Sequence, residues 1–376
     1  MPGKHSVLSP SSAPRWFYCQ RSARLCDQIP DEGSVYTAEG TEAHALCEYL
    51  LRQALGQDAV DPRPQMQYYS GEMEESAAGY VRFILKKVAA FREAGEDPAV
   101  YVEQLLDLRN YVPQSAGTAD CVVLAGDTAV IIDFKYGFLP VPATSLQLRL
   151  YALGVCEMFS ALYDFSRVRT VVYQPRLASV DESEMPVEEL YRWAREELAP
   201  RAKLAFDGAG EFAVGDWCRF CKARRNCRAL ARHQLELAQY DFAAPDLLTD
   251  AEIAEILSRV DELIAWANGV KEFALENALK GHGYQGFKVV PGRSVRRFSD
   301  DAAVAERVQD IGMDPWERKL LGVPALEKLL GKKKFTEILS DLVVRPEGKP
   351  QLVPESDKRP EMVNAEQEFA PVHPVN

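Results

Sequence analysis

The chain of 376 residues is longer than one typical domain, and its hydrophobic content of 47% is enough for a sizeable core. We expect one large domain with an appendage. No run of about 18 apolar residues and no signal peptide is found, which predicts a soluble, cytoplasmic protein without a membrane partner. The net charge of -12 excludes general coating of nucleic acid, so any contact with DNA must be local.

The expected order of elements is helix, strands, helix, strand, helix, which predicts an α/β fold. Helical spacing of apolar residues is found at 8–30, 38–56, 72–94, 144–162 and 187–206. Strand character is found in VYVEQLLDL, TADCVVL and AVIIDFKY, which we expect to be antiparallel, and at 166–176.

The rest of the chain predicts a helical C-terminal extension. Residues 245–281 have the pattern of a long amphipathic helix, with a capping box of Thr249 and Glu252. Residues 282–344 alternate strand-like and helical pieces and predict a small α+β region. Residues 345–376 are rich in proline and charge, which is typical of a disordered tail. The absence of a P-loop argues against ATP hydrolysis.

Residues 117–137 carry the most informative pattern. If Gly126 and Asp127 form a two-residue hairpin turn, Asp120 lies directly opposite Asp133. Lys135 shares their face of the sheet because side chains alternate along a strand. Two opposed carboxylates destabilise a sheet unless something compensates them. Lys135 alone could do so in a structural ion triad, or the site could hold a divalent cation such as Mg²⁺ or Mn²⁺.

Two further pairs lie at helical spacing, so that each pair shares one face of its helix. They are His44 with Glu48, and Gln147 with Tyr151. A lone histidine on a helix is more often structural than catalytic, so the neighbouring motifs decide its role.

The motifs GTEAH, GTAD, IDFK and QLRLY, taken in this order, resemble the RecB-like nucleases of the PD-(D/E)XK superfamily over residues 8–230. The resemblance implies a restriction-endonuclease-like core, a mixed central sheet flanked by helices, within a nuclease domain at 1–235. It implies that the metal ligands are His44, Asp120, Asp133 and the main-chain carbonyl of Phe134. The implied catalytic residues are Lys135, Asp133, Asp120, Gln147 and Tyr151. The N-terminal SPSSAPRW and the tail resemble phage and prophage-encoded members.

A second group of residues consists of cysteines spaced C-x2-C-x5-C, at Cys218, Cys221 and Cys227. The iron–sulfur branch of this superfamily, which includes the CRISPR-associated adaptation nucleases and the AddB nuclease domain, takes a fourth ligand from near the N-terminus. The resemblance therefore implies a [4Fe-4S] clasp completed by Cys19. Spacing alone leaves structural Zn²⁺ open, and it leaves Cys26 as an alternative fourth ligand.

Basic residues surround these cysteines: between residues 201 and 233, eight Lys or Arg stand against three carboxylates. Candidate DNA contacts are Arg219, Lys222, Arg224 and Arg225, with solvated helix charge as the alternative.

Together these features predict a metal-dependent deoxyribonuclease, expected to act as an exonuclease in phage DNA recombination, repair or processing inside a bacterial host cell. Its partners would be single-stranded DNA or duplex ends and a phage recombination or replication protein. The alternative is a catalytically inactive iron–sulfur DNA-binding module, or an adaptor in a recombination complex.

Overall fold

The computed structural model divides the chain into two compact units, Met1–Asn277 and Ala278–Asn376. It describes residues 6–30, 33, 35–236, 248–290, 301–310, 313, 315–316, 321–340 and 342–343. The tail expected at 345–376 therefore lies outside the described residues. Among the helices of the described residues, none combines the length and apolar character needed to cross a membrane.

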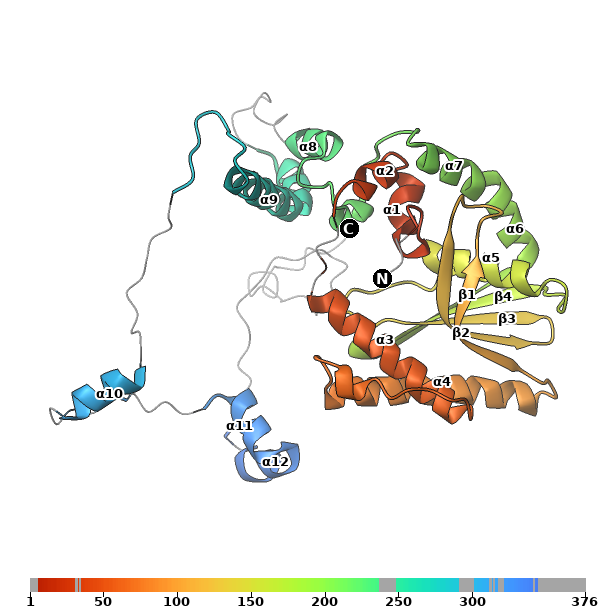
Figure 1. Cartoon of the computed structure of the whole chain (residues 1–376), viewed down its shortest axis with the longest axis horizontal. Helices are drawn as coiled ribbons and strands as arrows, with labels where there is room; N and C mark the ends of the chain where they lie inside the picture. Colours follow the sequence, from red (N-terminus) through yellow and green to blue (C-terminus); the bar gives the residue numbers. More distant parts are fainter. Residues whose placement is uncertain are drawn as a thin grey trace, which may run out of the picture. The chain divides into compact units, whose positions relative to one another are not determined.

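The first unit is built on a five-stranded mixed sheet with helices around it (Figure 1). The strands follow one another across the sheet in sequence order. They are β1 (Ala99–Asp107), β2 (Ala116–Ala125), β3 (Thr128–Phe134), β4 (Arg167–Gln174) and β5 (Ser179–Pro186). Strands β3 and β4 are parallel, and the other neighbours are antiparallel. The parallel pair needs a crossover, which α5 (Leu146–Phe159) supplies.

The hairpin of β2 and β3 has the register that the sequence predicts. Gly126 adopts a φ of 51°, which a primed two-residue turn requires. Pairing runs from Ala125 and Thr128 to Cys121 and Ile132. The next position along the ladder places Asp120 opposite Asp133.

Helices cover both faces of the sheet. On one face, alternate residues of β2 and β3, including Cys121 and Ile132, pack against α3 (Val35–Ala54) and α4 (Gly71–Glu93). On the other face, Val122 and Ile131 belong to a core shared with α5. That core also contains residues of α1 (Ala13–Tyr18), α2 (Ser22–Asp27), α6 (Val187–Trp193), the π-helix η4 (Ala194–Leu198) and α7 (Ala199–Asp207). The result is a mixed α/β architecture with the sheet as its central layer.

The N-terminal helices α1 and α2 pack on α7, which lies far along the chain. Arg24 of α2 donates a hydrogen bond of 2.6 Å to the carbonyl of Phe206. The Arg201 guanidinium lies 4.7 Å from the centre of the Phe17 ring. After α7 come the 3-10 helix η5 (Asp216–Phe220), α8 (Arg228–Leu235) and α9 (Asp250–Leu279). Thr249 and Glu252 form the expected capping box at the start of α9.

The sequence prediction differs from the structure at two places. Strand β5 was not predicted, because its residues SVDESEMP are mainly charged or polar and lie at the sheet edge, where such residues discourage pairing with another chain. In the second unit the described elements are helices, α10 (Asp301–Asp310), α11 (Val323–Leu330) and α12 (Lys332–Leu339). The strands expected between 282 and 344 are not found in the described part of that region.

Candidate active site

Three carboxylates lie in one row across neighbouring strands. The β2–β3 register, continued one position beyond its last pair of Cys121 and Ile132, sets Asp120 against Asp133. On its other side, Glu103 of β1 falls between the pairs Val102–Cys121 and Gln104–Ala119, which places it opposite Asp120. The fold therefore gathers negative charge at one level of the sheet.

Glu103 is the site residue that the sequence prediction missed. It has a φ of 52°, a left-handed conformation that costs a non-glycine residue on the order of 1 to 3 kcal/mol. Burial, together with the charges of Asp120 and Glu48, raises the pKa of Glu103 to about 7. Strain combined with unfavourable charge is typical of a functional site.

His44 approaches this row from α3. Its Nδ1 lies 3.3 Å from Oδ1 of Asp120. Burial lowers the pKa of His44, but the charge and hydrogen bond of Asp120, together with the charge of Asp133, raise it more, so the pKa is raised overall. Burial likewise raises the pKa of Asp120, and His44, Lys135 and the Phe134 N–H together lower it below its usual value. Glu48, four residues after His44 on α3, pairs with Arg52 at 2.8 Å.

Asp133 and Lys135 form the buried ion pair of the site. Lys135 Nζ lies 2.8 Å from Oδ2 and 3.1 Å from Oδ1 of Asp133, whose side chain is 2% exposed. Burial raises the pKa of Asp133, and the ammonium only partly offsets this. Asp133 and Asp120 raise the pKa of Lys135 against the effect of burial, so Lys135 carries its charge at neutral pH.

Gln147 and Tyr151 of α5 complete the predicted set. Gln147 donates a hydrogen bond of 3.0 Å to the Tyr151 hydroxyl. Burial raises the pKa of Tyr151, and the charges of Asp133, Asp120 and Glu103 add to this effect. The glycine of the GTAD motif makes room for the ring, since a Cβ on Gly117 would lie 2.8 Å from Cε1 of Tyr151.

The side chains fit a divalent cation. Among the described residues, one group of three or more His, Cys, Asp or Glu has ligand atoms within 4.8 Å of one another, and it consists of His44, Glu103 and Asp120. Asp133, which the resemblance implies as a ligand, is not in this group; its buried Oδ2 faces Lys135 at 2.8 Å and accepts no well-aligned hydrogen bond from any described residue. An imidazole and several carboxylates form a donor set that Mn²⁺ and Mg²⁺ accept. The Phe134 carbonyl stays a predicted ligand, while the Phe134 N–H bonds to Asp120.

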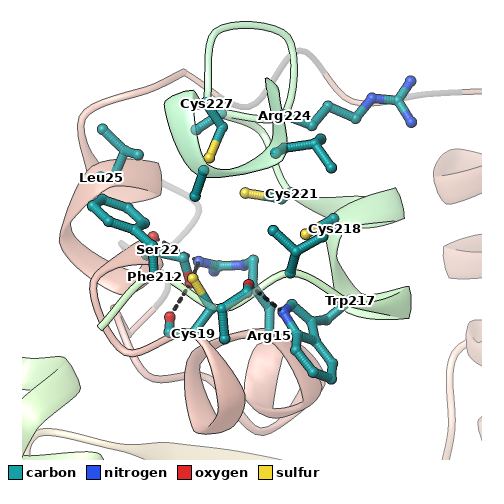
Figure 2. Close-up of a pocket in the computed structure, with 15 residues that line it drawn as sticks. Arg15, Cys19, Ser22, Leu25, Phe212, Trp217, Cys218, Cys221, Arg224 and Cys227 are labelled. Carbon is teal, nitrogen blue, oxygen red and sulfur yellow. Dashed lines mark hydrogen bonds between the residues drawn. The ribbon is translucent and has the colours of Figure 1, made fainter. Parts of the chain in front are cut away.

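The cysteines form a second site, between the N-terminal helices and the segment around η5. Cys19, Cys218, Cys221 and Cys227 line one cavity, and Figure 2 shows their sulfurs directed into it. Cys26, which is also buried, has its Sγ 3.6 Å from Sγ of Cys221. The hydrogen bond between these two thiols lowers the pKa of Cys26 to about 6 and raises that of Cys221. The fold thus gathers five of the eight cysteines.

The sulfurs of this cavity are less tightly grouped than the ligands of a single ion. Four thiolates at about 2.3 Å from one tetrahedral zinc would lie roughly 3.8 Å apart. No three described cysteines bring their sulfurs within 4.8 Å of one another. The Arg15 side chain also lines this cavity, so a positive charge lies beside the thiols.

The four arginines and lysines proposed to contact DNA have different environments. Arg225 pairs with Glu272 at 3.2 Å and Glu276 at 2.7 Å, so it anchors α9. Arg224 donates to the Arg219 carbonyl, and the Arg219 guanidinium lies 5.9 Å from the centre of the exposed Phe220 ring. Lys222 reaches the carbonyl of Ile29 at 3.5 Å. Arg219 and Arg224 have no carboxylate partner among the described residues, unlike Arg225.

A sequence model of the family described as "Protein of unknown function (DUF2800)" matches residues 5–360, and the chain belongs to this family. Among solved structures, the chain is similar to one titled "Crystal structure of SSO0001". The two share 11% identity over 57% of this chain and 96% of that chain, with a TM-score of 0.26. That score does not establish a common fold.

Proposed function

We propose that this protein is a metal-dependent DNA nuclease of the PD-(D/E)XK type. The observation that supports the proposal most strongly is the convergence of Asp120, Asp133 and Lys135 on adjacent strands, with His44 reaching them from α3. These are the residues that the RecB-like resemblance implies. A structural ion triad would need neither His44 nor Glu103.

Each residue has a role under this proposal. His44, Asp120 and Asp133 would hold Mg²⁺ or Mn²⁺, and Glu103 extends this set. When bound, the cation would supply a Lewis acid for phosphodiester hydrolysis. Lys135 is held as an ammonium by Asp133, so it would stabilise charge on the phosphate rather than remove a proton from water. The Gln147 and Tyr151 pair would orient the substrate or a water beside Lys135.

We further propose that Cys19, Cys218, Cys221 and Cys227 hold a [4Fe-4S] cluster, which would supply a covalent bridge between the two ends of the unit. Arg219 and Arg224, beside the exposed Phe220, would bind single-stranded DNA or a duplex end. Exonuclease action in phage DNA processing, with a recombination or replication protein as partner, belongs to the same proposal.

The test is degradation of end-labelled DNA by anaerobically purified protein. Wild type, Asp120→Asn and Lys135→Met are compared with Mn²⁺, Mg²⁺ or no metal on linear single-stranded, linear duplex and circular single-stranded DNA. Asp127→Asn, in the exposed hairpin turn, is the matched control. Metal-dependent cleavage lost in the first two variants and kept in the third supports a nuclease, and resistance of the circle identifies an exonuclease. If the protein binds DNA but cleaves none under any of these conditions, the nuclease proposal is wrong and the alternative, a catalytically inactive DNA-binding module, is supported.

A further inference from the structure

One arginine connects the separate elements that carry the site. Arg176 lies just after β4, in the 3-10 helix η3 (Pro175–Leu177), and its side chain is only 10% exposed. Its Nη1 and Nη2 donate to the two carboxylate oxygens of Glu39, at 3.1 and 2.6 Å. Its Nε donates to Glu72 at 3.1 Å. Its Nη1 also donates to the backbone carbonyl of Tyr136 at 3.2 Å.

Each partner belongs to a different part of the site. Glu39 lies on α3, five residues before His44, which is less than one and a half helical turns. The Tyr136 carbonyl belongs to the residue directly after Lys135. Glu72 lies in the first turn of α4. A single, mostly covered cation therefore joins the helix that carries His44 to the segment that carries Lys135.

Two aromatic rings lie close to this guanidinium. The Arg176 Cζ lies 3.7 Å from the centre of the Tyr136 ring and 4.9 Å from the centre of the Phe138 ring. A guanidinium bonded to both oxygens of one carboxylate has a defined orientation, which a lysine ammonium cannot reproduce. Its contacts therefore specify geometry as well as neutralising charge.

We propose that Arg176 is a positioning residue, which sets the distance between His44 and Lys135 and so the shape of the metal and phosphate site. This inference rests on the proposed nuclease function. Arg176 touches none of the reacting groups; it acts through Glu39 on α3 and through the Tyr136 carbonyl on the end of β3. A displacement of about 1 Å at such a site is sufficient to lower a rate by roughly 100-fold.

The test replaces Arg176 with lysine, which keeps the charge and loses the planar fork. Arg169→Lys is the matched control, because Arg169 lies on β4 and bonds Glu184 of β5 at 2.6 and 3.1 Å, in a pair that contacts no site residue. The measurements are kcat and KM for DNA cleavage, and Mn²⁺ affinity from paramagnetic resonance of the protein alone. Circular dichroism reports the folded fraction.

We expect Arg176→Lys to stay folded, to bind DNA with an unchanged KM, to lose about 10 to 100-fold in kcat, and to bind Mn²⁺ more weakly. Arg169→Lys should match the wild type. We also expect Glu39→Gln to lower kcat in the same way, and the double variant Glu39→Gln with Arg176→Lys to lose little more than either single variant, since both act through one connection.

The outcomes separate this inference from the proposed function. Wild-type protein that cuts DNA, beside an Arg176→Lys variant with the same kcat and Mn²⁺ affinity, overturns the inference alone. So does a loss of rate that only follows a loss of folded protein. If the wild-type protein binds Mn²⁺ but does not cut DNA, the proposed nuclease function is wrong. The positioning role of Arg176 is then tested by Mn²⁺ affinity alone: a weaker affinity in Arg176→Lys supports it, and an unchanged affinity overturns it. Wild-type protein that neither cuts nor binds Mn²⁺ overturns both.

Discussion

The backbone N–H of Phe134 donates a hydrogen bond of 2.7 Å to Oδ2 of Asp120, so the carboxylate of β2 is held by β3, which carries Asp133 and ends just before Lys135. An asparagine at this position keeps an oxygen that can accept the same bond. We therefore expect Asp120→Asn to fold as the wild type does while it loses cleavage by a factor of about 100 to 1,000, as for other groups that stabilise charge in a transition state. Cleavage rates and thermal unfolding, measured beside Asp127→Asn, check this.

The buried pair of Asp133 and Lys135 predicts a stability effect that depends on pH. In Lys135→Met the Asp133 carboxylate loses its cation, which should cost about 3 kcal/mol at neutral pH. The pKa of Asp133 is already raised and would rise further, so the cost is present above that pKa and disappears as acid protonates the carboxyl. The difference in Tm between variant and wild type should therefore be largest near pH 8 and shrink toward pH 5.

A double variant tests whether the unpaired charge of Asp133 causes this loss of stability. Asp133→Asn combined with Lys135→Met removes both charges and should recover most of the stability at neutral pH without recovering cleavage. A Lys135→Met variant whose Tm deficit is the same at every pH would show that packing, rather than the charge of Asp133, sets the cost.

Because the pKa of Glu103 is raised, we expect metal binding to be coupled to the release of a proton. Its pKa is raised to about 7, so a large fraction of the side chain is protonated at about pH 6.5. Since a cation binds the carboxylate form, Mn²⁺ uptake at this pH should release a proton, and the affinity should increase from about pH 6 to pH 8. Glu103→Gln should release fewer protons and bind Mn²⁺ on the order of tenfold more weakly. Calorimetry in two buffers of different ionisation enthalpy measures this, with Glu157→Gln as the control.

The raised pKa of Glu103 also makes the stability of the folded protein depend on pH. A carboxyl whose pKa is raised by folding destabilises the folded state once pH exceeds its unfolded value. The metal-free protein should therefore lose stability between about pH 5 and pH 8, and Glu103→Gln should lose less over that window. An identical pH profile for the two proteins would contradict the role given to Glu103.

Five cysteines lie together, and we expect four of them to be needed to hold the cluster and the fifth, Cys26, to be dispensable. Cys218→Ser should lose iron, sulfide and visible absorption, and limited proteolysis should then cut both near residue 20 and near residue 220. Cys26→Ser should keep iron and colour, because Cys26 does not line the cavity that the other four share. If Cys26→Ser loses iron and Cys19→Ser keeps it, Cys26 rather than Cys19 is the fourth ligand. If the purified protein is colourless and contains zinc, the site holds a single zinc ion and not an iron–sulfur cluster.

Much of the candidate site could be predicted from the sequence because local rules determine it. The Gly126–Asp127 turn and the alternation of side chains are sufficient to bring Asp120 opposite Asp133. Glu103 could not be found in this way. In VYVEQLLDL it looks like an ordinary solvent-facing residue, and its positive φ has no signature in the sequence. Arg176 escaped for another reason: its partners are 40 to 137 residues away. Contacts of that length depend on how α3, α4 and the sheet pack together.

The packing of α1 and α2 on α7 has a consequence during synthesis. Arg24 and Phe206 are separated by 182 residues. At about 5 to 20 residues per second, a ribosome needs roughly 10 to 35 seconds to make the chain between them. Until then Trp16 and Phe17, which are buried in the finished fold, lack part of their cover. The start of the nascent chain must therefore wait for helices made much later, and chaperone occupancy of this segment should fall only after α7 and the last cysteines have left the ribosome.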